Sequence, residues 1–121
     1  MSFETESTAG QGLLRRQTAT DHVPNGIISV SIDQDDVRNT LEVVSSKTAQ
    51  EILTVLTDEP HPASGVAEKV GASVQNVTYH LNRLDDAGII TPVETRYSKK
   101  GREMTVYGVS SEKLVIEFDS N

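Results

Sequence analysis

The sequence predicts an α+β fold, mainly α-helical with one small β-hairpin. Between residues 33 and 87, apolar residues recur at three- and four-residue intervals, which is the spacing of amphipathic helices. Two β-prone runs then flank a short turn that contains Gly101, and this arrangement predicts a hairpin. The 121 residues include no cysteine, so the core has to form without disulfides, as a helical domain of this length can.

The chain is expected to divide into a tail and one domain. Residues 1–24 are rich in Ser, Thr, Gly and acids, so they cannot bury enough apolar surface to offset the entropy of ordering, and a flexible tail is predicted. The domain spans residues 25–121. It begins with a strand over 27–32, where apolar and polar residues alternate. Its last segment, 113–118, is ambiguous between helix and strand, but its crowded β-branched residues favour a strand.

Two helices are predicted before the centre of the domain. Asp33 and Asp36 mark the start of the first helix, which runs to Ser45. Ser46 is placed to cap the second, which is closed by the Asp-Glu-Pro run at 58–60. The residues of the first helix expected on its apolar face are Val37, Leu41 and Val44.

The centre of the chain predicts a helix, a short turn and a second helix. A short amphipathic helix over 63–70 ends at Gly71. Ser73 is placed to cap a longer helix over 74–87, which stops at Gly88. At ~100° per residue, one arc of the longer helix holds the residues expected to face the core, namely Val74, Val77, Leu81 and Leu84.

The opposite side of the helix over 74–87 carries amides, hydroxyls and a guanidinium. Such groups bond base edges and phosphates, and an amide can both accept from and donate to adenine. Any solvated helix also shows a polar outer face, so the pattern by itself leaves both interpretations open. The candidate DNA-binding residues here are Ser73, Gln75, Asn76, Thr78, Tyr79, His80 and Arg83.

The hairpin is predicted from strands over 92–97 and 103–109, joined by a turn at 98–101. The chain has a net charge of -7, which is unfavourable for nucleic acid, yet within 71–109 basic residues slightly outnumber acidic ones. Clustered basic side chains neutralise phosphates and release counterions, whereas the alternative is an ordinary solvated turn. The candidate phosphate contacts are Arg96, Lys99, Lys100 and Arg102.

The segment over 63–90 and its centre, Ser73-x-x-x-Val77-Thr78-x-His80-Leu81-x-x-Leu84-x-x-Ala87-Gly88, resemble the helix-turn-helix of the ArsR-like winged-helix regulators. The upstream segment 41–53 is similar to the first-helix signature of that family, with Gln50 where an arginine is usual. The resemblance covers about 37–109. It implies a winged helix-turn-helix and a dimeric transcriptional regulator that binds double-stranded DNA in a sequence-specific manner. The helix over 74–87 would lie in the major groove and the wing over 96–102 on flanking phosphates.

Many members of that family respond to metals through cysteine and histidine clusters. Here there is no cysteine, and the three histidines have no paired metal spacing. We therefore expect no metal and no cofactor, and the sequence does not identify an effector. A catalytic set is not apparent on the predicted elements either, so an enzyme is not expected.

The alternative function is a winged-helix module that binds protein in a transcription or replication assembly, which the acidic net charge favours. The expected partners of a regulator are double-stranded DNA and a second copy of the chain. Dimerisation is expected through the first helix (37–44), helped by the terminal segments 27–32 and 114–118, whose apolar residues exceed what one small core needs.

Composition also predicts the environment of the protein. No apolar run reaches the ~18 to 20 residues of a membrane span, and the first residues lack the order of a signal peptide, so a cytoplasmic protein without a membrane partner is expected. The excess of 18 acidic over 11 basic residues suits strong salt, where the Debye length is ~3 Å at 1 M, although many ordinary proteins are acidic. A haloarchaeal-type regulator is therefore expected.

Overall fold

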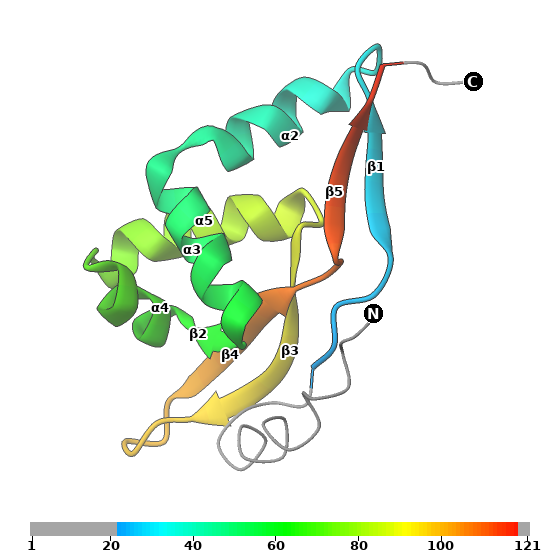
Figure 1. Cartoon of the computed structure of the whole chain (residues 1–121). Helices are drawn as coiled ribbons and strands as arrows, with labels where there is room; N and C mark the ends of the chain where they lie inside the picture. The colour runs from blue at the N-terminus through cyan, green and yellow to red at the C-terminus, as the bar shows by residue number, and fades with distance from the viewer. Residues whose placement is uncertain (1–21, 119–121) are drawn as a thin grey trace.

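The computed structural model describes residues 22–118 and confirms the α+β class, with four helices and five strands among these residues (Figure 1). The elements are β1 (Ile27–Ser31), α2 (Asp36–Ser45), α3 (Lys47–Asp58), β2 (His61–Pro62), α4 (Ala63–Val70), α5 (Val74–Asp86), β3 (Ile90–Tyr97), β4 (Glu103–Val109) and β5 (Lys113–Glu117). The predicted boundaries of the helices over 63–70 and 74–87 therefore agree with α4 and α5 to within one residue.

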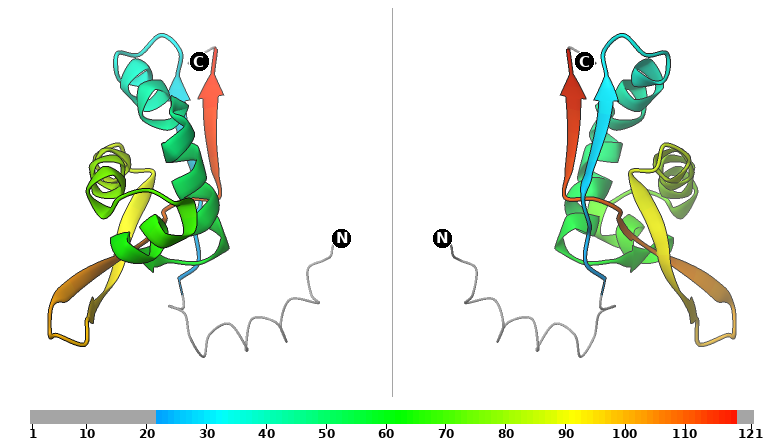
Figure 2. Two further views of the ribbon diagram at one scale, coloured as in Figure 1. Left: turned by 90° about the vertical axis from the view of Figure 1, so that its left-hand side faces the viewer. Right: turned by 90° about the vertical axis from the view of Figure 1, so that its right-hand side faces the viewer.

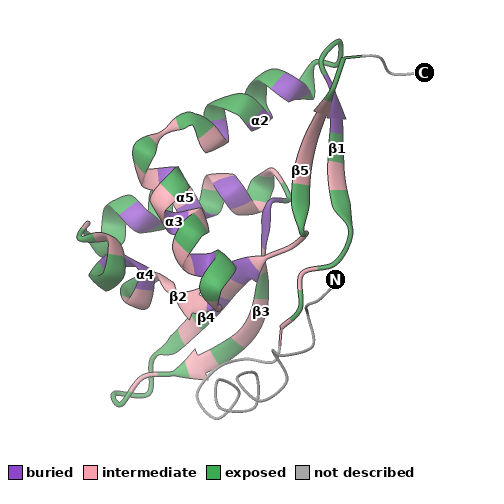
Figure 3. Ribbon diagram, viewed as in Figure 1, coloured by how far each residue is buried: buried purple, intermediate pink, exposed green. Residues whose placement is uncertain are grey.

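The core lies where α3, α4 and α5 meet the base of the β3–β4 hairpin, and the tip of the hairpin is largely exposed (Figure 3). The buried side chains are aliphatic and come from every one of these helices, which is how short amphipathic helices form a common core. The largest fully buried side chains of the domain are Ile52, Leu56, Val66, Val77, Leu81, Leu84, Ile90 and Val106.

The first helix packs differently from the prediction. In α2, Val37 is buried as expected, but Leu41 is 39% exposed and Val43 is buried instead. The side of α2 that meets the other helices thus includes Thr40 and Val43. Spacing alone did not fix this choice, because Leu41, Val43 and Val44 all lie within one turn of the helix.

The hairpin is confirmed, with two differences. Strand β3 begins at Ile90, two residues before the predicted start, because Ile90 is buried and pairs with Val109 at the end of β4. The pairing shifts between Pro92 and Glu94, where the proline has no N–H to donate. The link around His61, which the sequence predicted only as a tight connection, forms the short strand β2 on the outer edge of β4.

Strands β1 and β5 pair in parallel within the chain, from Ile27 opposite Lys113 to Ser31 opposite Glu117. This confirms the strand assignment of both terminal segments. The β1–β5 pair stands on one side of the molecule, and α5 and the hairpin lie toward the opposite side (Figure 2). Residues 1–21 of the predicted tail lie outside the described residues. His22, within the predicted tail, donates from Nε2 to the carbonyl of Val109 at 2.7 Å.

Candidate nucleic-acid interface

Helix α5 is anchored by three aliphatic side chains, Val77, Leu81 and Leu84, which are at most 1% exposed. Its ends are fixed as the sequence predicts. The Ser73 hydroxyl oxygen accepts a hydrogen bond from the backbone N–H of Asn76 at 3.0 Å, and Gly88 follows the helix in the left-handed conformation, with φ 78°. Because the inner face and both ends are fixed, the rotation of the helix is fixed too, and its polar face points away from the core.

The predicted polar face of α5 is open to solvent. Most of its candidate residues are exposed, and His80 and Arg83 are half-buried. No other part of the described chain buries this face. The exposed candidates are Ser73, Gln75, Asn76, Thr78 and Tyr79.

Tyr79 contacts two other side chains of α5, those of Arg83 and His80. The Arg83 guanidinium lies 5.7 Å from the centre of the Tyr79 ring, a cation–π distance, and its Nη1 lies 3.5 Å from the Tyr79 hydroxyl. The His80 ring meets the same tyrosine ring edge-on, with 5.2 Å between ring centres. These contacts restrict the rotamers of Tyr79 and Arg83, so less entropy is lost when a ligand binds the hydroxyl and the guanidinium.

Val74 differs from the prediction, because it is 49% exposed rather than buried in the core. It is the first residue of α5. With Thr78 and Leu81 it lines a groove of about 360 Å³ between α5 and the hairpin, opposite Met104 and Tyr107 of β4. Sequence reasoning missed this residue as a site residue, since its helical spacing matches that of Val77 and Leu81.

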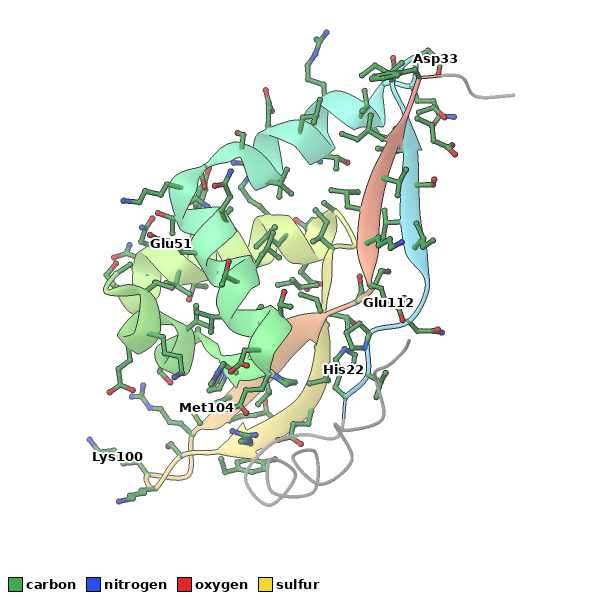
Figure 4. All side chains as sticks on the ribbon, in the orientation of Figure 1. His22, Asp33, Glu51, Lys100, Met104 and Glu112 are labelled. Carbon is green, nitrogen blue, oxygen red and sulfur yellow. The ribbon has the colours of Figure 1, made fainter. Side chains whose placement is uncertain are left out.

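The tip of the hairpin is held by hydrogen bonds around Ser98. The Ser98 hydroxyl oxygen accepts from the backbone N–H groups of Lys100 at 3.3 Å and Arg102 at 3.0 Å, and Gly101 adopts φ 81°. Lys99, Lys100 and Arg102 are exposed, and Lys100 projects from the tip (Figure 4). The short turn therefore brings three of the four predicted phosphate contacts together.

Arg96 is placed differently from the other basic wing residues. It lies within β3, is half-buried, and its Nε is 2.6 Å from Oε2 of Glu94. This ion pair offsets the charge of Arg96, which is one of the four basic residues that the sequence predicts as phosphate contacts of the wing. Arg96 also lines a second pocket with His61 and residues of α4, at some remove from the turn. The structure thus brings Lys99, Lys100 and Arg102 together and leaves Arg96 apart from them.

Within residues 22–118 no three metal-ligating side chains come together. His61 is packed beside Glu59, whose Oε2 is 3.8 Å from its Nε2. Burial lowers the pKa of His61, and the nearby Glu59 carboxylate opposes that shift. None of the helices over the described residues has the length and apolarity to cross a membrane.

Residues 44–93 match a family model described as a helix-turn-helix domain. The fold is a winged helix-turn-helix. It is similar to the ArsR-like transcriptional regulator from Rhodococcus sp. RHA1, with 30% identity, a TM-score of 0.52, and coverage of 61% of this chain and 62% of that one. Less than two thirds of the Rhodococcus regulator is thus spanned. The family model and the Rhodococcus structure together confirm the winged helix-turn-helix fold that the resemblance in the sequence implied.

Two further solved structures share the fold. NolR from Sinorhizobium fredii is 24% identical, with a TM-score of 0.51 over 63% of this chain and 70% of that chain. The homodimeric winged helix-turn-helix DNA-binding domain of Mb0332 from Mycobacterium bovis, a possible ArsR-family regulator, is 17% identical, with a TM-score of 0.51 over 64% and 66%. A comparison with curated protein sequences finds no match. Of these solved structures, the Rhodococcus protein is described as a transcriptional regulator and the Mb0332 domain as a DNA-binding domain.

Proposed function

We propose that this protein is a sequence-specific transcriptional regulator that binds double-stranded DNA. In this proposal the N-terminal half of α5 enters the major groove, and the hairpin tip contacts phosphates beside it. Gln75 and Asn76 are the base-reading amides, and Arg83 is a phosphate contact further along the helix.

The observation that carries the proposal is that the polar side chains of α5 are exposed and that α5 and the basic hairpin lie on the same side of the molecule (Figure 2). A duplex offers bases and phosphates to both elements at once. The two carboxylates at the end of α5, Asp85 and Asp86, would repel phosphates, so the proposed contact ends at Arg83.

Binding is tested with a duplex selected from a random library by the full chain. Arg83→Ala is expected to lower affinity about tenfold, because a charge-assisted contact to phosphate is lost. Tyr79→Ala is expected to weaken binding as well. Both side chains lie outside the core, so circular dichroism and thermal unfolding should stay close to those of the unaltered chain. Unchanged affinity in both variants would contradict the proposed interface.

The wing is tested through salt. Lys100→Ala should lower the slope of log affinity against log salt by about 0.9 if one phosphate contact is lost. The matched control is Lys113→Ala, an exposed lysine on β5 that lies outside α5 and the hairpin tip. Equal slopes for Lys100→Ala and the unaltered chain would remove the hairpin tip from the interface.

The second candidate function is a protein-binding module. The exposed apolar groups Val74, Tyr79 and Tyr97 favour it, because protein interfaces use aliphatic and aromatic anchors. The two functions differ in their response to DNA. A chain for which library selection recovers no duplex at moderate salt would support the protein-binding module.

A homodimer is proposed as the DNA-binding form. Several large apolar side chains remain exposed around β1, α2 and β5, where the chain's own core does not cover them, and the similar Mb0332 domain is homodimeric. Sedimentation at high salt should show a dimer, which Leu41→Glu should weaken, whereas Tyr97→Ser on the hairpin should not. A monomer at all concentrations would contradict this proposal. The exposed residues concerned are Ile27, Ile32, Leu41 and Phe118.

Strong salt is proposed as the working environment, because the net charge of -7 is self-repelling in dilute solution. The expected result is a free energy of unfolding that rises between about 0.1 and 1 M salt, as the Debye length falls from about 10 to 3 Å. KCl and NaCl should act alike, since screening depends on ionic strength. Stability that is flat over this range would contradict the proposal.

A further inference from the structure

Val74 is an aliphatic side chain on the rim of the proposed DNA-binding face. A single exposed valine is ordinary on a protein surface. Val74, however, lies in the first turn of α5, the part of such a helix that enters the major groove. Its neighbours Val77 and Leu81 are buried, so the exposure of Val74 reflects its position at the end of the helix and not a poorly packed core.

The surroundings of Val74 are also partly apolar. Thr78 lies one turn further along α5 and lines the same groove between the helix and the hairpin. Thr78 contributes a methyl group besides its hydroxyl. Val74 and Thr78 therefore form a small apolar strip beside the amide of Gln75, which is exposed on the outward face.

The major groove offers one apolar group among its base edges, which is the C5 methyl of thymine. Adenine, the partner of thymine, presents in the same groove an acceptor and a donor that suit an amide such as that of Gln75. An aliphatic strip next to an exposed amide thus matches the two halves of an A·T base pair.

We propose that Val74 contacts the C5 methyl group of a thymine and helps to determine which sequence is bound. The inference rests on the proposed function and adds to it a residue and the chemical group that this residue recognises. Gln75 would bond the adenine of the same or an adjacent pair, so the preferred sites should contain an A·T pair at this position.

The test combines a change in the protein with a change in the DNA. The full chain first selects a duplex from a random library, and each thymine of that duplex is then replaced in turn by deoxyuridine, which lacks only the methyl group. One replacement should weaken binding by the unaltered chain about fourfold, the factor that corresponds to burying one methyl-sized group. Val74→Ala should bind the original duplex about fourfold less tightly and should not respond to that replacement.

Two controls keep the test specific. Val23→Ala removes another exposed valine, far from α5 in the chain, and should respond to deoxyuridine as the unaltered chain does. Val74→Ser should behave like Val74→Ala. Thermal unfolding checks that each variant folds, which is expected because Val74 is half-exposed.

The outcomes separate this inference from the function on which it rests. Duplex binding that is indifferent to every deoxyuridine, or that loses the same factor in Val74→Ala as in the unaltered chain, overturns the role of Val74 and leaves the regulator proposal intact. Failure to select any duplex overturns both, and Val74 would then belong to a protein-binding surface.

Discussion

The contact between His22 and Gly108 makes a prediction that can be worked out from the structure. Gly108 is buried in β4, and its backbone is not in the left-handed region, so an alanine could adopt the same conformation. Space is what opposes the substitution. A Cβ at position 108 would lie 2.8 Å from Cδ2 and 3.2 Å from Nε2 of His22. The imidazole ring therefore has to move.

The magnitude follows from two opposing effects of Gly108→Ala. Moving the ring breaks its hydrogen bond to the Val109 carbonyl, 2.7 Å long, which contributes about 0.5 to 1.5 kcal/mol. Replacing glycine lowers the entropy of the unfolded chain and stabilises by about 0.4 to 1 kcal/mol. The net change in the free energy of unfolding should thus lie between a gain of about 0.5 kcal/mol and a loss of about 1 kcal/mol.

The two effects separate when His22 is also changed. In a His22→Ala background the ring is gone, and the nearest remaining atom, Cγ1 of Val93, is at an acceptable 3.4 Å. Gly108→Ala should then stabilise by about 0.4 to 1 kcal/mol. The double-mutant cycle should give a coupling of about 1 kcal/mol, measured by urea unfolding followed by circular dichroism.

The control pairs Gly108→Ala with Val23→Ala, the exposed neighbour of His22. Those two changes should be additive within about 0.3 to 0.5 kcal/mol. If His22→Ala and Gly108→Ala are additive to the same degree, the imidazole does not lie on Gly108 in solution, and the reasoning about this contact is refuted.

Three further predictions concern stability, each measured by urea unfolding. Ser73→Ala removes the cap of α5 and should cost about 1 kcal/mol; no change would show that the cap bond is not formed in solution. Leu81→Ala empties a fully buried position and should cost about 2 to 5 kcal/mol, and a smaller cost would mean a loosely packed α5. Burial lowers the pKa of His61 below its ordinary 6.5, so the unfolded chain binds more protons around that pH. Stability should therefore fall as the pH drops from 7 through 6.5 and below, and His61→Gln should make this fall shallower; an unchanged pH profile would contradict the assignment.

The helices and their caps could be predicted because their signals are local. The hydroxyl of Ser46 accepts from the backbone N–H of Ala49 at 2.9 Å, and that of Ser73 accepts from Asn76 in the same way. Each bond joins residues three apart, so both partners are read from one short segment. The candidate residues on the polar face of α5 could be named for a similar reason, since α5 buries the central arc that its sequence predicts.

The exposure of Val74 could not be predicted in this way, whereas the ion pair of Arg96 is a local contact that charge counting overlooks. Both residues fit their patterns, a helical core position and a basic wing position. The exposure of Val74 depends on what packs against the first turn of α5. Glu94 and Arg96, by contrast, are two residues apart in β3, where side chains at i and i+2 share a face, and Oε2 of Glu94 lies 2.6 Å from Nε of Arg96. Helical spacing contains no information on the environment of Val74, whereas the alternation of side chains along a strand could have indicated the Glu94–Arg96 pair.

By itself the sequence determined the α+β class, the limits of α4 and α5, and the polar character of the outward face, since these depend on residues within a turn of one another. The tertiary structure alone decided that β1 pairs with β5 inside one chain and that His22 meets Val109, 87 residues away. It also decided that Val74 is exposed and not part of the core. These features depend on packing between residues that are distant in the sequence. For a given strand or side chain, several other segments of the chain would be chemically suitable partners, and only the folded arrangement selects one of them.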